Sequence, residues 1–281
     1  MSQVLQTEYS FREKWEKNRQ LAFSETLREG SDIFKWILDR NGFSTPAEFS
    51  KWLECRTRVL DAGCGNGRVT ALIRKYAPMN TAITGIDLTA AEVARENLKS
   101  FENIQIQEGN LLGDLSGLGE FDLIYCQEVL HHTADPRGAF LNLCSRLARG
   151  GEIAIYVYKI KPPIREYADD FIRDRVSELS YDEAMKAMKE VAALGRELAA
   201  LDVKVTVPEV KVLGIDAGEY DIQRFIYHFF LKCFWNPSLS FDENAAINHD
   251  WYHPQLCTRH TLQEVQGWLV DAGVDEIHNC V

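Results

Sequence analysis

The sequence predicts an α/β fold in which a mostly parallel sheet carries helices on both faces. Short β-branched apolar runs alternate with helical segments between residues 57 and 158, and a glycine-rich turn follows the first run directly. Parallel strands need crossover helices, which produces this alternation. The expected strands are 57–61, 81–87, 104–107, 121–126 and 152–158, with helices at 68–76, 90–99 and 136–147.

Three further segments are expected around this core. The full division is an N-terminal helical segment (1–56), the core (57–158), a helical and aromatic lid insertion for substrate (159–255), and the final helix and strand of the core (256–281). Outside the core, helical periodicity of apolar residues is clearest at 182–201, 221–235 and 261–272.

The C-terminal edge of the sheet is the least regular part of this prediction. After the last periodic helix, only one strand fits, near 276–280. The sheet edge is therefore expected either to be shortened or to be completed by the 205–213 segment.

Composition favours a cytoplasmic protein that acts on a small molecule. The 281 residues carry a formal net charge of −11, which repels nucleic-acid phosphates and anionic membrane surfaces. Seven cysteines occur without a CxxC pair, as is common in a reducing compartment. No signal-peptide pattern and no run of 18 apolar residues is present. We expect a small-molecule substrate, no nucleic acid, no membrane, and a monomer or homodimer.

The glycine-rich turn is the most informative motif. Asp61 ends the first strand, and Gly63, Gly65 and Gly67 follow, allowing the backbone to approach a ligand at a helix N-terminus. Arg68 stands where a dinucleotide-binding turn has its third glycine. A pyrophosphate would also face the Asp61 carboxylate, whereas a sulfonium and an ammonium would be attracted. The turn favours S-adenosylmethionine over NAD, with a plain connecting turn as the alternative.

The stretch LDAGCGNGR, residues 60–68, resembles the first motif of class I S-adenosylmethionine-dependent methyltransferases. The resemblance covers residues 57–158 well. It implies a Rossmann-like sheet of the seven-stranded type, with S-adenosyl-L-methionine as cofactor and S-adenosyl-L-homocysteine as product. The implied cofactor-binding residues are Asp61, Gly63, Cys64, Gly65, Asn66, Asp87, Leu88, Asn110, Leu111 and Gln127.

The resemblance also assigns roles to individual residues. Asp87 would accept from the ribose hydroxyls, and Leu88 would pack on the adenine. Asn110 stands where the family more often has Asp, and it would bind the adenine amino group. Gln127 would border the methionine part of the cofactor. Plain turn roles remain the alternatives for Asp87 and Asn110.

Histidines next to the fourth strand are the first candidates for chemistry. Methyl transfer by direct displacement requires the acceptor to lie in line, about 3–3.5 Å from the methyl group. His132 or His131 could take the proton of a hydroxyl acceptor, or the pair could only shape the loop. Tyr252 and His253 are second-choice acid/base groups. Adjacent histidines hold one metal poorly, so no metal is expected.

Two residues of the N-terminal segment are weaker candidates. The resemblance implies that Trp15 and Arg12 could close over the cofactor, as N-terminal helices do in relatives.

The leading hypothesis is a methyltransferase acting on a small molecule, with oxygen favoured as the acceptor. One alternative is an RNA or protein methyltransferase, which the acidic composition disfavours in the case of RNA. Another is a non-methylating S-adenosylmethionine-binding protein serving as a regulator, a scaffold or a pericyclase-like enzyme, because binding and turnover need different residues.

Overall fold

The computed structural model describes residues 1–274 and 276–280. The chain forms two compact units. The sheet unit comprises Trp15–Tyr158 and Thr258–Val281, and the helical unit comprises Met1–Lys14 and Lys159–Cys257. Helix α1, Gln3–Lys17, crosses the boundary, so the N-terminal helices are shared between the two units.

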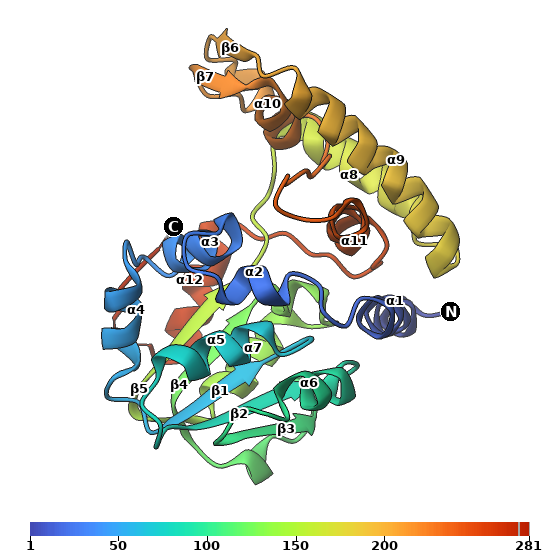
Figure 1. The fold of residues 1–281 in the computed structure, drawn as a ribbon. Coiled ribbons are helices and arrows are strands. Elements are labelled where there is room, and N and C mark those ends of the chain that lie inside the picture. The colour runs from blue at the N-terminus through green and yellow to red at the C-terminus, as the bar shows by residue number, and fades with distance from the viewer. Residues whose placement is uncertain (275, 281) are drawn as a thin grey trace. The chain divides into compact units, whose positions relative to one another are not determined.

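The sheet unit contains a parallel sheet with the strand order β3-β2-β1-β4-β5, five strands among the described residues (Figure 1). Order reverses between β1 and β4, and ligands bind at the carboxyl ends of strands next to such a switch point. The strands are β1 Arg58–Ala62, β2 Ala82–Asp87, β3 Ile104–Glu108, β4 Phe121–Gln127 and β5 Leu147–Tyr156.

Helices cover both faces of this sheet. Ala71 of α5 and Leu98 of α6 pack in one buried cluster, whereas Phe140 of α7 and Trp268 of α12 pack in another with Ile124. The helices are α2 Phe23–Leu27, α3 Asp32–Arg40, α4 Pro46–Leu53, α5 Arg68–Tyr76, α6 Ala91–Leu98, α7 Pro136–Cys144 and α12 Leu262–Asp271, with short 3-10 turns η1 Ser116–Leu118 and η2 Leu130–His132.

The helical unit is built around two long helices. Capping boxes begin α9 at Ser180 with Glu183 and α11 at Ser240 with Glu243, because each side chain satisfies a backbone N–H that the first turn leaves open. Its elements are α8 Pro163–Val176, α9 Tyr181–Ala200, β6 Lys204–Val207, η3 Lys211–Leu213, β7 Gly218–Asp221, α10 Ile222–Phe229 and α11 Phe241–Tyr252. None of the described helices in the chain is long and apolar enough to cross a membrane.

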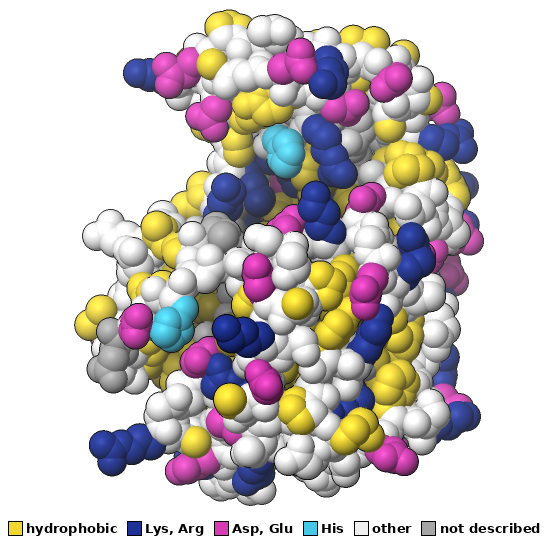
Figure 2. All heavy atoms as spheres, turned by 60° about the vertical axis from the view of Figure 1, so that its left-hand side comes forward, with side chains coloured by type: hydrophobic (Ala, Val, Ile, Leu, Met, Phe, Trp, Pro, Cys, Tyr) yellow, Lys and Arg dark blue, Asp and Glu magenta, His cyan; other side chains and the backbone are white. Residues whose placement is uncertain are grey.

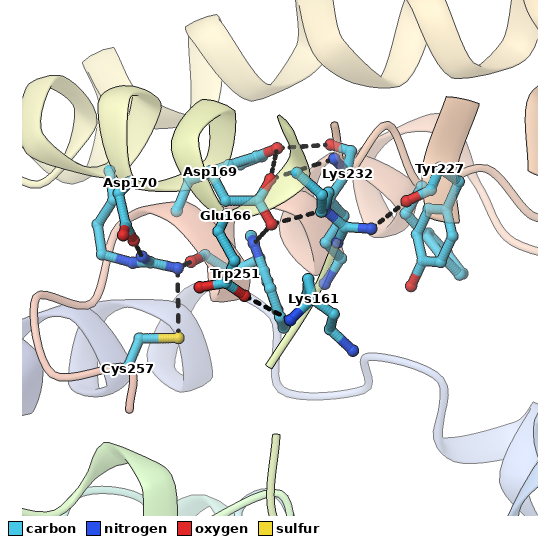
Figure 3. Close-up of polar contacts among 12 residues, drawn as sticks. Lys161, Glu166, Asp169, Asp170, Tyr227, Lys232, Trp251 and Cys257 are labelled. Atoms are coloured by element: carbon cyan, nitrogen blue, oxygen red, sulfur yellow. Dashed lines mark hydrogen bonds and ion pairs between the residues drawn. The ribbon is translucent and has the colours of Figure 1, made fainter. Parts of the chain in front are cut away.

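One buried carboxylate joins the helices of the helical unit (Figure 3). Asp169 on α8 is 1% exposed and accepts from Arg165 Nε at 2.6 Å. It also accepts from Trp251 Nε1 at 2.7 Å, from the Tyr252 hydroxyl at 2.9 Å and from the Lys232 backbone N–H at 3.3 Å. A carboxylate offers about four acceptor positions, so Asp169 is fully used.

At the C-terminal edge of the sheet, the structure differs from two expectations. Among the described residues 276–280, none is in a strand, so the strand expected there is wrong. The 205–213 segment does not complete the sheet, because its strand β6 pairs antiparallel with β7 in the helical unit. The Rossmann-like α/β class is confirmed, with a sheet shorter than the seven-stranded type.

The aromatic helix expected at 221–235 ends at Phe229. The chain after it has no regular secondary structure from 231 to 236, and two amide side chains of α11 bind its backbone. Asn248 accepts from the Phe234 N–H at 2.8 Å and donates to the Phe234 carbonyl at 3.1 Å. Asn244 does the same for Asn236, at 2.7 and 3.0 Å.

Replacing Asp169 should destabilise the protein strongly. In Asp169→Asn the buried Arg165 loses its charge partner, and breaking a buried pair costs about 3–5 kcal/mol. Asp242→Asn is the matched control, because both side chains of the Lys189–Asp242 pair are exposed and such a pair is worth at most about 1 kcal/mol. Urea unfolding of both variants measures the two free energies, and equal losses would refute the role given to Asp169.

Candidate functional site

Three glycines shape the turn between β1 and α5. Gly63, Gly65 and Gly67 have φ values of 81°, 54° and 84°, in the left-handed region that side chains disfavour. A Cβ on Gly63 would lie 2.4 Å from Val129 Cγ2. The N–H groups of Gly63 and Cys64 both donate to the Ile86 carbonyl, at 2.8 and 3.0 Å. The turn is therefore held against β2, with a path that only glycine allows.

Asp87 fixes the same turn from the end of β2. Its Oδ2 accepts from the Gly65 N–H at 2.9 Å. Its Oδ1 accepts from the N–H groups of Thr89 and Ala90, at 2.9 and 2.8 Å. A carboxylate oxygen has two lone pairs, so Oδ2 keeps one for a further donor such as a ribose hydroxyl. The bare backbone and this acceptor fit a nucleoside ligand.

Asp61 lies beneath the turn and is 3% exposed. Its Oδ2 accepts from the Thr70 hydroxyl of α5 at 2.6 Å. Burial is the main cause that raises the Asp61 pKa to about 6, against the opposing hydrogen bond from Thr70. The carboxyl is mostly ionised at pH 7, so the negative charge inferred from the sequence is present below the backbone of the turn.

Cys64 and Asn66 are buried within the turn. The Asn66 amide donates to the backbone carbonyls of Arg19 and Leu21, at 3.2 and 3.1 Å. Cys64 Sγ lies 3.2 Å from the position that a Cβ on Gly85 would take. These side chains hold the turn in place, so any contact they offer a ligand comes from their backbone.

The residues expected around the adenine differ in exposure. Leu88 is half-buried after β2, and Leu111 is 6% exposed in the core cluster beside Leu115. Asn110 is exposed, and its Oδ1 accepts from the Leu112 N–H at 2.9 Å. A role of Asn110 toward adenine stays a proposal.

Gln127 at the end of β4 belongs to a network that the sequence did not predict. It accepts from the Tyr125 hydroxyl at 2.7 Å and donates to Asn41 Oδ1 at 2.6 Å. Arg40, beside Asn41, pairs with Glu128 at 3.0 Å. In the sequence, Asn41-Gly42 indicates only an ordinary helix C-terminus, so it did not identify this network in advance.

Glu128 marks the point where β4 turns into the histidine loop. Its φ of 64° is left-handed, which is costly for a residue with a side chain and is found mainly at functional sites. The Arg40 guanidinium that pairs with it lies 3.4 Å from the Trp36 ring centre and 4.0 Å from that of Tyr156. These contacts fix the loop that carries His131 and His132.

The two histidines differ in exposure. His131 is fully buried, and its ring stacks on Tyr158 with the centres 3.6 Å apart. His132 is partly exposed, 4.4 Å from the His131 ring and edge-on to Tyr158 at 5.7 Å. Of the pair, only His132 has solvent-exposed surface.

Tyr252 and His253 lie in the core of the helical unit, not in the sheet unit. Tyr252 is fully buried and donates to Asp169, and burial raises its pKa well above the usual value. His253 is fully buried between Ser10 at 2.7 Å and the Leu179 carbonyl at 3.2 Å, and burial lowers its pKa. Both side chains have structural partners there.

The two N-terminal candidates, Trp15 and Arg12, belong to different units. Trp15 lies over the glycine turn, because a Cβ on Gly65 would be 2.7 Å from Trp15 Cζ2. Arg12 is exposed and belongs to the helical unit.

The raised pKa of Asp61 predicts a pH effect on stability. A carboxyl whose pKa is higher in the folded state binds its proton more tightly there, so stability falls as pH rises from 3.8 to about 6. Relative to Asp61→Asn, which does not titrate, the wild type should lose up to roughly 3 kcal/mol between pH 4 and pH 7.5. Urea unfolding at several pH values measures this difference, and a constant difference would contradict the assignment.

Comparisons with known proteins place these features in a family. The chain is 32% identical over 100 residues to a trans-aconitate 2-methyltransferase of Deinococcus radiodurans, covering 36% of this chain and 37% of that protein. It is 32% identical over 107 residues to a ubiquinone biosynthesis O-methyltransferase of Caulobacter sp. (strain K31), covering 35% and 39%. The matches span less than half the length of these curated relatives.

A solved structure also matches. It is the N-methyltransferase NodS of Bradyrhizobium japonicum in complex with S-adenosyl-L-homocysteine, with 23% identity, a TM-score of 0.36, and coverage of 49% of this chain and 72% of that one. The model of a methyltransferase domain matches residues 53–199, just over half of the chain. The chain therefore belongs to the methyltransferase domain family, within the class I S-adenosylmethionine-dependent methyltransferases that its glycine turn resembles.

Proposed function

We propose that the protein transfers a methyl group from S-adenosyl-L-methionine to a small-molecule acceptor, with an oxygen atom as the favoured acceptor. The observation that carries the proposal is the left-handed glycine turn, whose backbone is fixed by the Ile86 carbonyl and the Asp87 carboxylate. Family membership supports it.

Cofactor binding would fall to the turn and the strand ends around it. Gly63, Gly65 and the backbone of Cys64 would lie against the ligand, and Asp87 Oδ2 would accept from a ribose hydroxyl. The bound cofactor supplies a methyl group on a sulfonium, which an acceptor oxygen takes by direct displacement. Asp61 supplies negative charge below the turn, and this charge favours binding of a cationic ligand and disfavours binding of a pyrophosphate.

Oxygen is favoured for two reasons. One curated relative named above is an O-methyltransferase, and His132 is a partly exposed imidazole at the carboxyl end of β4. A hydroxyl acceptor must lose its proton as the new bond forms, and an imidazole with a pKa near 6.5 suits that step. His131 is buried, so it acts by positioning His132.

Transfer of a labelled methyl group tests the function. The full chain, incubated with methyl-labelled S-adenosylmethionine and a fractionated metabolite extract, should label a small molecule and release S-adenosylhomocysteine. Gly63→Ala should bind S-adenosylhomocysteine at least tenfold more weakly by calorimetry, because the new Cβ meets Val129. Gly117→Ala is the matched control, since a Cβ there meets nothing within 4 Å.

The outcomes separate the alternatives. Tight S-adenosylhomocysteine binding without label transfer to any fraction would favour a non-methylating binding protein. Label on RNA or protein, with RNA binding that weakens steeply as salt rises, would replace the small-molecule acceptor by a macromolecule.

His132→Ala tests the base. If His132 takes the acceptor proton, kcat should fall about 10²- to 10⁴-fold with the isolated acceptor while the affinity for S-adenosylhomocysteine stays unchanged. His278→Ala, at an exposed site, is the control for loss of an imidazole. Unchanged kcat in His132→Ala would remove the base role and favour an acceptor that needs no deprotonation.

A further inference from the structure

The helical unit carries a group of positive side chains that the proposed function does not use. Lys159 and Lys161 precede α8, Arg165 lies in its first turns, and Arg224 lies on α10, all close enough to lower the pKa of His228. We call Lys159, Lys161, Arg165 and Arg224 the cationic cluster. Figure 2 shows Lys and Arg side chains gathered beside a histidine on one face of the molecule. The concentration is unusual in a chain of net charge −11.

Arg165 is the fixed part of the cationic cluster. It is 2% exposed, pairs with Asp169 at 2.6 Å and donates to the Tyr227 carbonyl (Figure 3). Its guanidinium carbon also lies 5.0 Å from the Tyr227 ring centre. Asp169 is used up by Arg165 and three other donors, so it has no acceptor position left for the remaining cations.

Three members of the cationic cluster have no carboxylate partner. Within residues 1–274 and 276–280, none of Lys159, Lys161 and Arg224 forms an ion pair. The Lys161 ammonium lies 5.7 Å from the Trp251 ring centre, and the Arg224 guanidinium lies 5.5 Å from that of Tyr227. Aromatic rings thus flank these charges, and the Asp169 and Glu166 carboxylates act on Lys161 without forming an ion pair with its ammonium.

The pKa values of Lys161 and His228 are both lowered in this arrangement. Burial, with Arg165 and Lys159 next, lowers the pKa of Lys161 to about 8, although Asp169 and Glu166 act in the opposite direction. Burial, with Arg224 and Arg165 next, lowers the pKa of His228 to about 4, so its imidazole is neutral at pH 7. A bound anion would relieve this repulsion, and the neutral imidazole could hydrogen-bond to it.

We propose that the cationic cluster binds a carboxylate or phosphate group of a small organic anion. Arg offers a planar fork and Lys a point charge, a combination that suits such oxyanions. A nucleic acid is disfavoured, because the remainder of the chain repels a long polyanion.

Calorimetry on the full chain tests the anion site, with citrate and inorganic phosphate as probes at constant ionic strength and pH 7. We expect at least one probe to bind. Lys161→Gln and Arg224→Gln should each weaken its binding about tenfold, the loss of one charge-assisted hydrogen bond. Lys186→Gln is the matched control, because it removes the same charge from an exposed position of α9 outside the cluster.

The outcomes of this experiment decide the proposal. No heat with either probe, or equal weakening in Lys186→Gln, would overturn the anion site in favour of an ordinary solvated surface. Tighter binding of an RNA oligonucleotide, weakened by the same two substitutions, would also overturn it. Binding of S-adenosylhomocysteine, measured in the same samples, should not change in any variant, and its absence in the wild type would count against the proposed function alone.

A pH series adds a check that a merely structural role would not pass. Because Lys161 loses its charge near pH 8, probe affinity should fall as pH rises through that value. The fall should be absent in Lys161→Gln. The charged groups that act on Lys161 are Arg165, Lys159, Asp169 and Glu166, and the Lys232 ammonium lies over the same Trp251 ring as the Lys161 ammonium.

Discussion

The backbone path between β1 and α5 governs the sheet unit, because three left-handed residues must follow one another at close spacing. Two N–H groups of the turn share the Ile86 carbonyl, and a third donates to Asp87. The same contacts that close the turn onto β2 also place an acceptor oxygen beside bare backbone at the carboxyl edge of the sheet. Fold and ligand geometry here have one cause, so substitutions in the turn cannot change one without the other.

Local periodicity was sufficient for most of the sheet unit. Strands β1 to β4 and helix α5 lie within one residue of the predicted bounds, because each element buries its own regular face. The predicted bounds of β5 were wrong at its start, since β5 begins at Leu147, within the predicted helix 136–147. Helices α8 and α11 were missed since their buried faces contain polar residues such as Arg165, Asn244 and Asn248. Such helices carry no apolar stripe to detect. Their stability depends on partners far away in the sequence.

In the candidate site, too, local sequence patterns predicted some features, whereas others depend on tertiary contacts. Motif spacing located the glycine turn, Asp87 and the histidine loop, but it could not separate side chains that face a ligand from those that hold the turn. Asn66 binds the backbone of Arg19 and Leu21, a segment 45 residues or more away. Arg40 and Asn41 reach Glu128 and Gln127 from α3. These contacts depend on tertiary structure, for which one sequence has no local signal.

Tyr252 and His253 explain why a mixed aromatic and polar stretch resembles an active site. The helical unit replaces part of an apolar core by buried hydrogen bonds, and Asp169 is the acceptor on which four of them converge. A carboxylate that serves four donors can neutralise only one cation, here Arg165. Lys161 and Arg224 form no ion pair among the described residues, so the polar core of this unit bears directly on its cationic surface.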